Sequence, residues 1–154
     1  MGHGVYLALY KGKGLIGNAV IRKWTRSIYS HCELVVDGVC YSSSLMDKGV
    51  RSKQINLNDG NWDLIELPER FGNHVLDYFA KTRGQRYGWL DLIRSQLFNL
   101  GSDEPGASFC SEWCAAALGI PSPTIYSPDT LGKLVRAMFR PPLAPERRRR
   151  LQKH

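Results

Sequence analysis

The residues best suited to covalent chemistry are a cysteine and a histidine that lie far apart in the chain. Cys110 stands near the start of a helix-like segment, residues 108–119, directly after a loop-like stretch rich in Gly, Pro and acidic residues at 101–107. The N-terminus of a helix has unpaired N–H groups and a partial positive charge, and both favour a thiolate over a thiol. Because the thiolate is the nucleophilic form of cysteine, the sequence predicts Cys110 as a nucleophile at a helix N-terminus.

The histidine that fits this chemistry is His31, which lies in the strand-like run SHCELVV at residues 30–36. A cysteine and a histidine distant in sequence can form a nucleophile–base pair in the fold, so we predict His31 as the base. Side chains alternate along a strand, so Cys32 is expected to enter the core on the opposite face. Glu33 shares the face of His31, and we predict it as a rim residue or a substrate contact.

The other cysteines do not point to a metal or to disulfides. Cys110 and Cys114 are spaced to share one face of a helix. With His31 or His74 they could form a zinc site, but structural zinc sites usually contain two tight ligand pairs, and this chain has one. We predict no metal and no cofactor. Cys114 is expected in the core, and Trp113, beside the nucleophile, is expected to line the substrate cleft.

The periodicity of the chain predicts a sheet together with helices. Asp37-Gly38 between two strand-like runs is a strong hairpin signal. Ser127-Pro128 has the residue types of a helix N-cap followed by the first helical position. Strands that cluster without βαβ alternation indicate an α+β domain in which helices flank an antiparallel sheet. The predicted strands are 5–10, 32–36, 39–43, 50–57 and 62–67, and the predicted helices are 16–24, 68–83, 89–97, 108–119 and one that begins at 127.

The length and composition fit a single folded domain. The chain has 154 residues, of which 43% are hydrophobic, enough for a core without disulfides or metal. It contains no run of the roughly 18 apolar residues that a membrane span needs. Residues 1–13 lack the basic, apolar and cleavage regions of a signal peptide. We therefore expect cytoplasmic synthesis, or delivery to the cell envelope or a virion by a route without an N-terminal signature.

The positive charge is concentrated in the last residues. The net charge is +7, and residues 140–154 hold six basic residues against one acidic residue, so +5 belongs to this tail and +2 to the rest. We divide the chain into a domain at 1–139 and a flexible basic Pro/Arg tail at 140–154. The weak charge of the body argues against a nucleic-acid-binding surface on it. The run Arg147 to Arg150 is either a solvated end or a docking arm for a polyanionic partner.

Several short segments together resemble a known family. They are YSHCELVVDG, GVR, NWDLIEL, RYGWLDL, FCSEWCAAALGI and YSPDTL, which lie between about residues 5 and 135. In this order they resemble the permuted branch of the NlpC-like, papain-like cysteine hydrolases, where the catalytic histidine precedes the cysteine. The resemblance implies a permuted papain-like domain with Cys110 as nucleophile and His31 as base. Lecithin:retinol acyltransferase-like proteins are similar in motif order.

The third catalytic group is where the sequence departs from that pattern. These families place a polar residue on the strand after the histidine strand, where it orients the imidazole. Here this strand is VCYSSS, residues 39–44, with neither a histidine nor a carboxylate. Counting across the hairpin turn, we predict Ser42 in this role, with Ser44 as the next choice and Asp47 in the following loop as a further alternative.

The resemblance implies a cysteine hydrolase that forms a thioacyl intermediate. The expected substrate is an amide, such as one in the stem peptide of peptidoglycan, and N–H groups at the helix start, including that of Cys110, would stabilise the oxyanion. An acyl-ester hydrolase or an acyltransferase is the enzymatic alternative. The alternative from another class is a non-catalytic binding or virion protein on the same fold.

Overall fold

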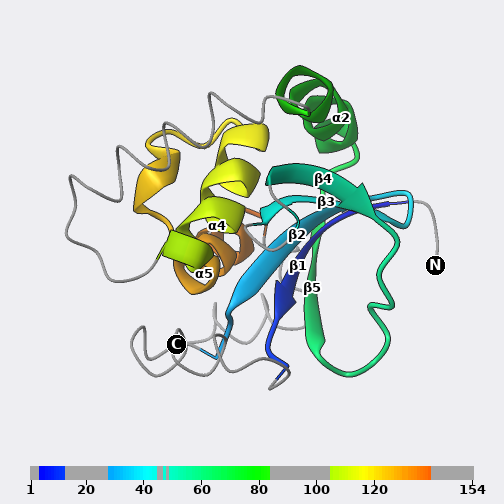
Figure 1. Cartoon of the computed structure of the whole chain (residues 1–154), viewed down its shortest axis with the longest axis vertical. Helices are drawn as coiled ribbons and strands as arrows, with labels where there is room; N and C mark the ends of the chain where they lie inside the picture. Colours follow the sequence, from blue (N-terminus) through cyan, green and yellow to red (C-terminus); the bar gives the residue numbers. More distant parts are fainter. Residues whose placement is uncertain (1–3, 13–27, 45–46, 48, 84–104, 140–154) are drawn as a thin grey trace, which may run out of the picture.

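The computed structural model describes residues 4–12, 28–44, 47, 49–83 and 105–139, and only the backbone of 105–109. In these parts the chain is α+β, with a five-stranded antiparallel sheet and three α-helices (Figure 1), as predicted. None of the described helices is long and apolar enough to cross a membrane. The predicted helices at 16–24 and 89–97 and the tail at 140–154 lie outside the described residues. The elements are β1 (Val5–Tyr10), β2 (His31–Val36), β3 (Val39–Ser44), β4 (Gly49–Lys53), β5 (Trp62–Leu67), α2 (Arg70–Thr82), α4 (Pro105–Ala117), the 3-10 helix η1 (Pro123–Ile125) and α5 (Pro128–Met138).

The strands follow the order β4-β3-β2-β1-β5, so β4 and β5 form the edges and β1, β2 and β3 lie inside the sheet. The predicted β2–β3 hairpin is confirmed, and both turn residues have positive φ, 48° at Asp37 and 83° at Gly38. Such a two-residue turn matches the right-handed twist of the flanking strands. The strand predicted at 50–57 ends earlier than expected, at Lys53.

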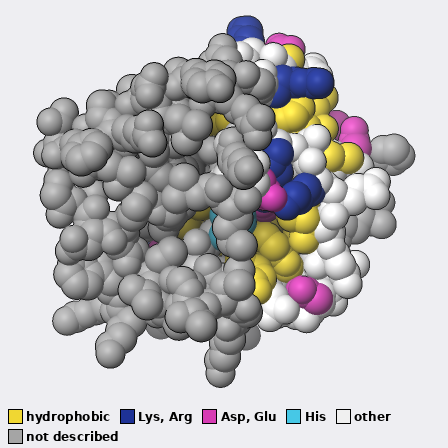
Figure 2. Space-filling model, in the orientation of Figure 1, with side chains coloured by type: hydrophobic (Ala, Val, Ile, Leu, Met, Phe, Trp, Pro, Cys, Tyr) yellow, Lys and Arg dark blue, Asp and Glu magenta, His cyan; other side chains and the backbone are white. Residues whose placement is uncertain are grey.

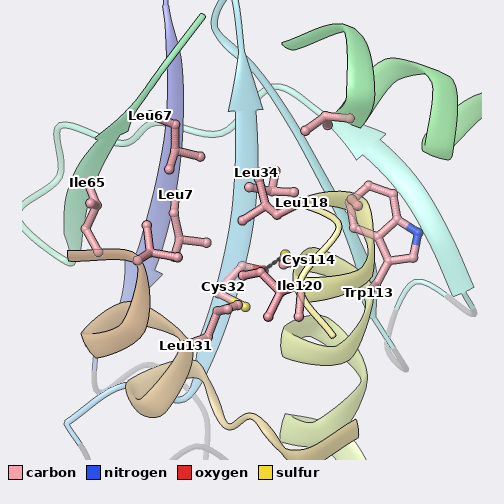
Figure 3. Close-up of a cluster of buried hydrophobic side chains, with 14 of the residues drawn as sticks. Leu7, Cys32, Leu34, Ile65, Leu67, Trp113, Cys114, Leu118, Ile120 and Leu131 are labelled. Atoms are coloured by element: carbon pink, nitrogen blue, oxygen red, sulfur yellow. Dashed lines mark hydrogen bonds between the residues drawn. The ribbon is translucent and has the colours of Figure 1, made fainter. Parts of the chain in front are cut away.

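The main core lies between one face of the sheet and helices α4 and α5, which Figure 1 shows on the same side of it. Leu7 of β1 pairs with Leu34 of β2 and with Ile65 of β5, so the three side chains form an apolar row across the sheet. Figure 3 shows this row beside Cys114 and other side chains of α4. The opposite face carries a smaller apolar cluster made by Ala8, Val35, Cys40 and Leu57. Alternation along the strands therefore produces two different faces, and His31 belongs to the second one.

Helix α5 begins where the sequence predicts. Ser127 is its N-cap: the Ser127 hydroxyl accepts the backbone N–H of Thr130 at 3.2 Å, and the Thr130 hydroxyl accepts the backbone N–H of Ser127 at 2.8 Å. Pro128 follows at the first helical position, where its missing N–H has no cost. This cap sets the start of a helix whose Leu131 and Val135 are fully buried in the main core.

We expect Ser127→Ala to lower the free energy of unfolding by about 1 kcal/mol, because the backbone N–H of Thr130 loses its acceptor. Urea denaturation measures this change. Ser127→Asp is the matched control, since its carboxylate can accept the same N–H and favours the positive end of the helix. Equal stabilities of the alanine and aspartate variants would show that the cap does not contribute.

Candidate active site

The candidate site lies where β2 and β3 separate. Their ladder pairs Leu34 with Tyr41, Val35 with Cys40 and Val36 with Val39. Beyond it, the carbonyl of Cys32 accepts the Ser42 hydroxyl at 2.8 Å and the Cys114 thiol at 3.9 Å. The backbone N–H of Cys32 contacts the sulfur of Cys110. The open end of the ladder therefore lets a side chain of α4 bind the β2 backbone directly.

At this place the structure brings Cys110 and His31 together. Their side chains are hydrogen-bond partners and interact electrostatically. A hydrogen bond from the Cys32 thiol lowers the pKa of Cys110, burial opposes this, and the charge and hydrogen bond of His31 lower it further, to well below its usual value. Burial acts to lower the pKa of His31, but Cys110 and then Glu33 outweigh it and raise the pKa to about 10. Both shifts favour a thiolate–imidazolium pair.

The position of Cys110 within its helix differs from the prediction. Helix α4 begins at Pro105, so Cys110 is its sixth residue and lies in the second turn. The Gly/Pro-rich stretch predicted as a loop supplies part of the first turn, where proline is tolerated. The helix dipole acts mainly within the first turn, and an N–H in the second turn has a helical partner. The prediction that the nucleophile stands at the helix N-terminus is therefore wrong. The contacts at β2 lower the pKa of Cys110 instead.

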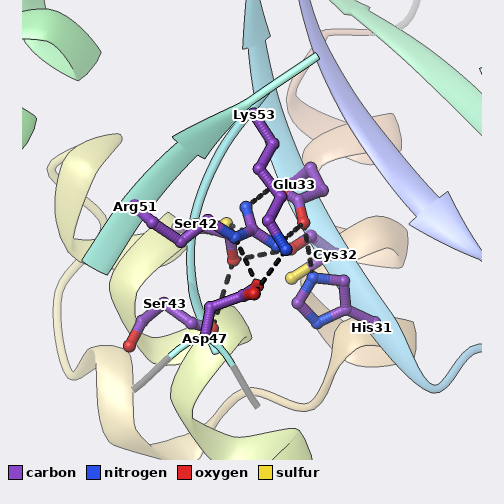
Figure 4. A network of polar contacts seen from close by, with 9 residues as sticks. His31, Cys32, Glu33, Ser42, Ser43, Asp47, Arg51 and Lys53 are labelled. Atoms are coloured by element: carbon purple, nitrogen blue, oxygen red, sulfur yellow. Dashed lines mark hydrogen bonds and ion pairs between the residues drawn. The ribbon is translucent and has the colours of Figure 1, made fainter. Parts of the chain in front are cut away.

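Glu33 holds the imidazole from the other side. Its carboxylate oxygen Oε1 lies 2.6 Å from Nε2 of His31, and its side chain is 0% exposed. The prediction of a rim residue is wrong, because the side chain is enclosed at the site and is not at its edge (Figure 4). Burial raises the pKa of Glu33, but hydrogen bonds from Arg51 and then from His31 outweigh it, and the net direction is downward. Glu33 is therefore a carboxylate at neutral pH.

Arg51 of β4 neutralises this carboxylate. Its Nη1 and Nη2 donate to the two oxygens of Glu33, each at 2.6 Å, and its Nε donates to Asp47 at 2.8 Å. Asp47 also binds Lys53. Arg51 pairs in register with Ser42 of β3, the strand between β4 and β2, and the small serine leaves room for the arginine to reach across. Figure 2 shows basic and acidic side chains side by side on the described surface, next to hydrophobic ones.

The structure assigns other partners to the residues predicted to orient the imidazole. Ser42 is on the expected face, but its hydroxyl donates to the carbonyl of Cys32. Ser44 ends β3 opposite Gly49, and Asp47 binds Arg51 and Lys53. The residue on the ring of His31 is Glu33, two positions along the same strand. The signal that could have found it is a His-x-Glu spacing on one strand face, combined with a basic residue in the GVR segment.

The expected role of Trp113 is also corrected. Its ring is fully buried against Tyr78 at 5.6 Å between centroids, and its Nε1 donates to Thr82 at 3.1 Å. It is therefore a core residue and does not line a cleft. Among the described residues, Trp62 lies beside His31, edge-on at 6.5 Å between ring centroids. Sequence reasoning counted Trp62 among the tryptophans of the core or the cleft walls and preferred Trp113, because only the strand register places β5 on this side of the site.

The buried thiols have different environments. Cys40 lies on the face of Glu33, and burial together with that negative charge raises its pKa to about 11. Burial also raises the pKa of Cys32, whose thiol contacts both Cys110 and Cys114. The pKa of Cys110 moves in the opposite direction, downward. Within the described parts of the chain, no three His, Cys, Asp or Glu side chains are arranged to hold a metal ion.

Comparison of the chain with protein-family models, with curated proteins and with solved structures finds no match. What the site can do chemically therefore follows from its own geometry. A buried thiol that is hydrogen-bonded to a protonated imidazole, which is itself held by a carboxylate, has the parts needed for nucleophilic catalysis. The carboxylate is in turn fixed by an arginine.

We expect the imidazole of His31 to remain protonated through neutral pH and to lose its proton near pH 10. A raised pKa means that the charged form persists above pH 6.5, where an ordinary histidine is already half neutral. NMR titration of the ring nitrogens measures this. Cys110→Ser removes the negative charge that raises this pKa most, so the midpoint should fall, whereas Cys40→Ser should leave it in place. A wild-type midpoint near 6.5 would contradict the ion pair.

Proposed function

We propose that this protein is a cysteine hydrolase in which Cys110 is the nucleophile and His31 the general acid–base. The observation that carries the proposal is the contact between these two side chains, each of which shifts the pKa of the other toward the charged form. Glu33 takes the role of the third group and orients the imidazole through Nε2. Perturbed pKa values of this kind cluster at functional sites.

The proposed reaction has two steps. The Cys110 thiolate attacks the carbonyl carbon of an amide, and His31 gives its proton to the departing amine, which leaves a thioester on the sulfur. The neutral imidazole then takes a proton from water as the hydroxyl attacks the thioester. The acid is released and the thiolate–imidazolium pair is restored. Glu33 remains ionised throughout and stabilises the imidazolium, as the carboxylate does in other nucleophilic triads.

The fold that we propose is a permuted papain-like, NlpC-like domain. An antiparallel sheet with His31 on a strand that precedes the nucleophile helix supports this order of elements. The resemblance of the segments around His31 and Cys110 to that family supports an amide of the peptidoglycan stem peptide as the substrate. This choice of substrate depends on analogy of motifs alone.

A second candidate, an acyltransferase or acyl-ester hydrolase, is favoured by one specific observation. Cys110 belongs to the main apolar core, and its side chain is 0% exposed. An apolar, water-poor surrounding protects a thioester from hydrolysis and favours transfer to another acceptor. The two candidates share the nucleophile and the base and differ in what attacks the thioester.

Activity should separate these candidates. We expect hydrolysis of purified peptidoglycan stem peptides by the wild type, and a loss of at least about 10³-fold in kcat/KM for Cys110→Ser, because the nucleophile is removed. Cys40→Ser is the matched control, since this buried thiol has a raised pKa and lies off the site. Cleavage of acyl esters with transfer to an added amine or alcohol, and none of the peptide, would favour the second candidate.

Thiol labelling tests the nucleophile without a known substrate. We expect iodoacetamide to modify Cys110 faster than Cys32, Cys40 or Cys114 at pH 7, measured by peptide mass spectrometry. All four side chains are buried alike, so a faster rate at Cys110 reports its thiolate character. His31→Ala should slow this reaction selectively. Equal rates at all four positions, together with inactivity on every substrate, would favour the non-catalytic alternative.

A further inference from the structure

We propose that Arg51 is a positioning residue of the active site, which acts through Glu33 to keep the Cys110–His31 pair charged and oriented. The inference rests on the proposed function and deepens it. Arg51 lies on β4, two strands away from His31 in the sheet order. It belongs to the GVR segment, to which sequence reasoning assigned no role.

The geometry of Arg51 is that of a built clamp. Its two terminal nitrogens bind both oxygens of Glu33, and its Nε binds Asp47, so the guanidinium is held on two sides. Its side chain is only 15% exposed. A planar guanidinium that binds a carboxylate bidentately fixes the plane of that carboxylate. Figure 4 shows the result, in which Glu33 lies between the arginine and the ring of His31.

One carboxylate oxygen joins the two halves of the network. Oε1 of Glu33 lies 2.6 Å from Nη2 of Arg51 and 2.6 Å from Nε2 of His31. Any rotation of the carboxylate away from the arginine would therefore also move the acceptor of the imidazole. The orientation of His31 toward Cys110 depends in this way on a residue that does not touch it.

The charges give a second reason. Among the described residues, the charged or titratable groups next to the pair are Glu33 on β2 and the Cys32 thiol. Arg51 on β4 binds Glu33 and also Asp47, whose charge Lys53 offsets. With a thiolate, an imidazolium, a carboxylate and a guanidinium, the buried set is neutral. Without the guanidinium it carries an excess negative charge, which is costly in a buried site. A proton must then bind one of the acids, so the thiolate becomes less favourable.

The test measures the thiolate of Cys110 directly, with no need for a substrate. Its ultraviolet absorbance is followed against pH, as the difference between each protein and its Cys110→Ser counterpart. We expect Arg51→Met to raise the midpoint of thiolate formation by about one to three pH units. Arg51→Lys should give a smaller rise, because lysine keeps the charge and loses the bidentate geometry. Lys53→Met is the matched control: Lys53 is on the same strand and binds the same Asp47, and its removal should leave the midpoint unchanged.

Thermal unfolding shows whether Arg51→Met folds. If it does not, the same substitution is tested in the Glu33→Gln protein. In the Glu33→Gln protein the charge that Arg51 neutralises is absent. If Arg51 acts through Glu33, adding Arg51→Met should raise the thiolate midpoint far less in the Glu33→Gln background than in the wild type. A purely structural arginine would change thermal stability and leave the thiolate midpoint unmoved.

The outcomes separate this inference from the proposed function. An ordinary cysteine pKa for Cys110 in the wild type would overturn both. A low wild-type pKa that does not respond to Arg51→Met would overturn only the role of Arg51. That role is equally overturned if Arg51→Met shifts the midpoint in the Glu33→Gln background as much as in the wild type.

Discussion

The arrangement of the site depends on how the negative charge of one buried carboxylate, that of Glu33, is neutralised. Glu33 is fully enclosed, and an ionised carboxylate without partners would be too costly to bury. It is acceptable here because Arg51 binds both of its oxygens and His31 binds one of them. This pairing ties β2 to β4 across β3 and makes a small residue, Ser42, suitable at the crossing point. A buried ion pair adds little to stability compared with apolar packing, but loss of one partner is strongly unfavourable.

The separation of β2 from β3 is the second constraint. Strand alternation places His31 and Cys32 on opposite faces of the sheet, and α4 packs on the face of Cys32. A continuous ladder would keep Cys110 apart from His31. Because the described pairing of the two strands stops at Leu34, the sulfur of Cys110 reaches the Cys32 backbone and the ring of His31 together. The site is therefore located at the open end of a hairpin.

Burial alone does not determine the state of a thiol in this protein. Cys40 and Cys110 are equally enclosed, yet the pKa of one is raised to about 11 and that of the other is lowered. The difference comes from neighbouring groups. Cys40 is near the negative charge of Glu33, whereas Cys110 accepts hydrogen bonds from the Cys32 thiol and from His31. The carboxylate of Glu33 thus raises the pKa of the Cys40 thiol directly. Through the imidazole of His31 it helps to lower the pKa of the Cys110 thiol.

The sequence by itself determined the features that depend on neighbours in the chain. Alternating apolar residues predicted the strands, Asp37-Gly38 predicted the hairpin, and Ser127 predicted the start of α5, because local backbone sterics and capping decide these. The types and separation of His31 and Cys110 also allowed them to be chosen as a pair. The sequence placed the start of α4 too late, since the Gly/Pro-rich stretch before Cys110 is compatible with both a loop and a first helical turn.

Only the tertiary structure decided which groups surround that pair. Ser42 and Glu33 both lie on the face of His31, and alternation cannot tell which of them points its oxygen at the ring. Glu33 is the partner of the ring because Arg51 binds its carboxylate, and Arg51 lies close enough to do so only in the observed register of β4 against β3. Trp113 stands three residues from the nucleophile and is nevertheless in the core, because the rotation of α4 turns it toward α2. The register of β4 against β3 and the rotation of α4 depend on a longer connection and on packing across the domain, unlike the register of the β2–β3 hairpin, which its two-residue turn determines.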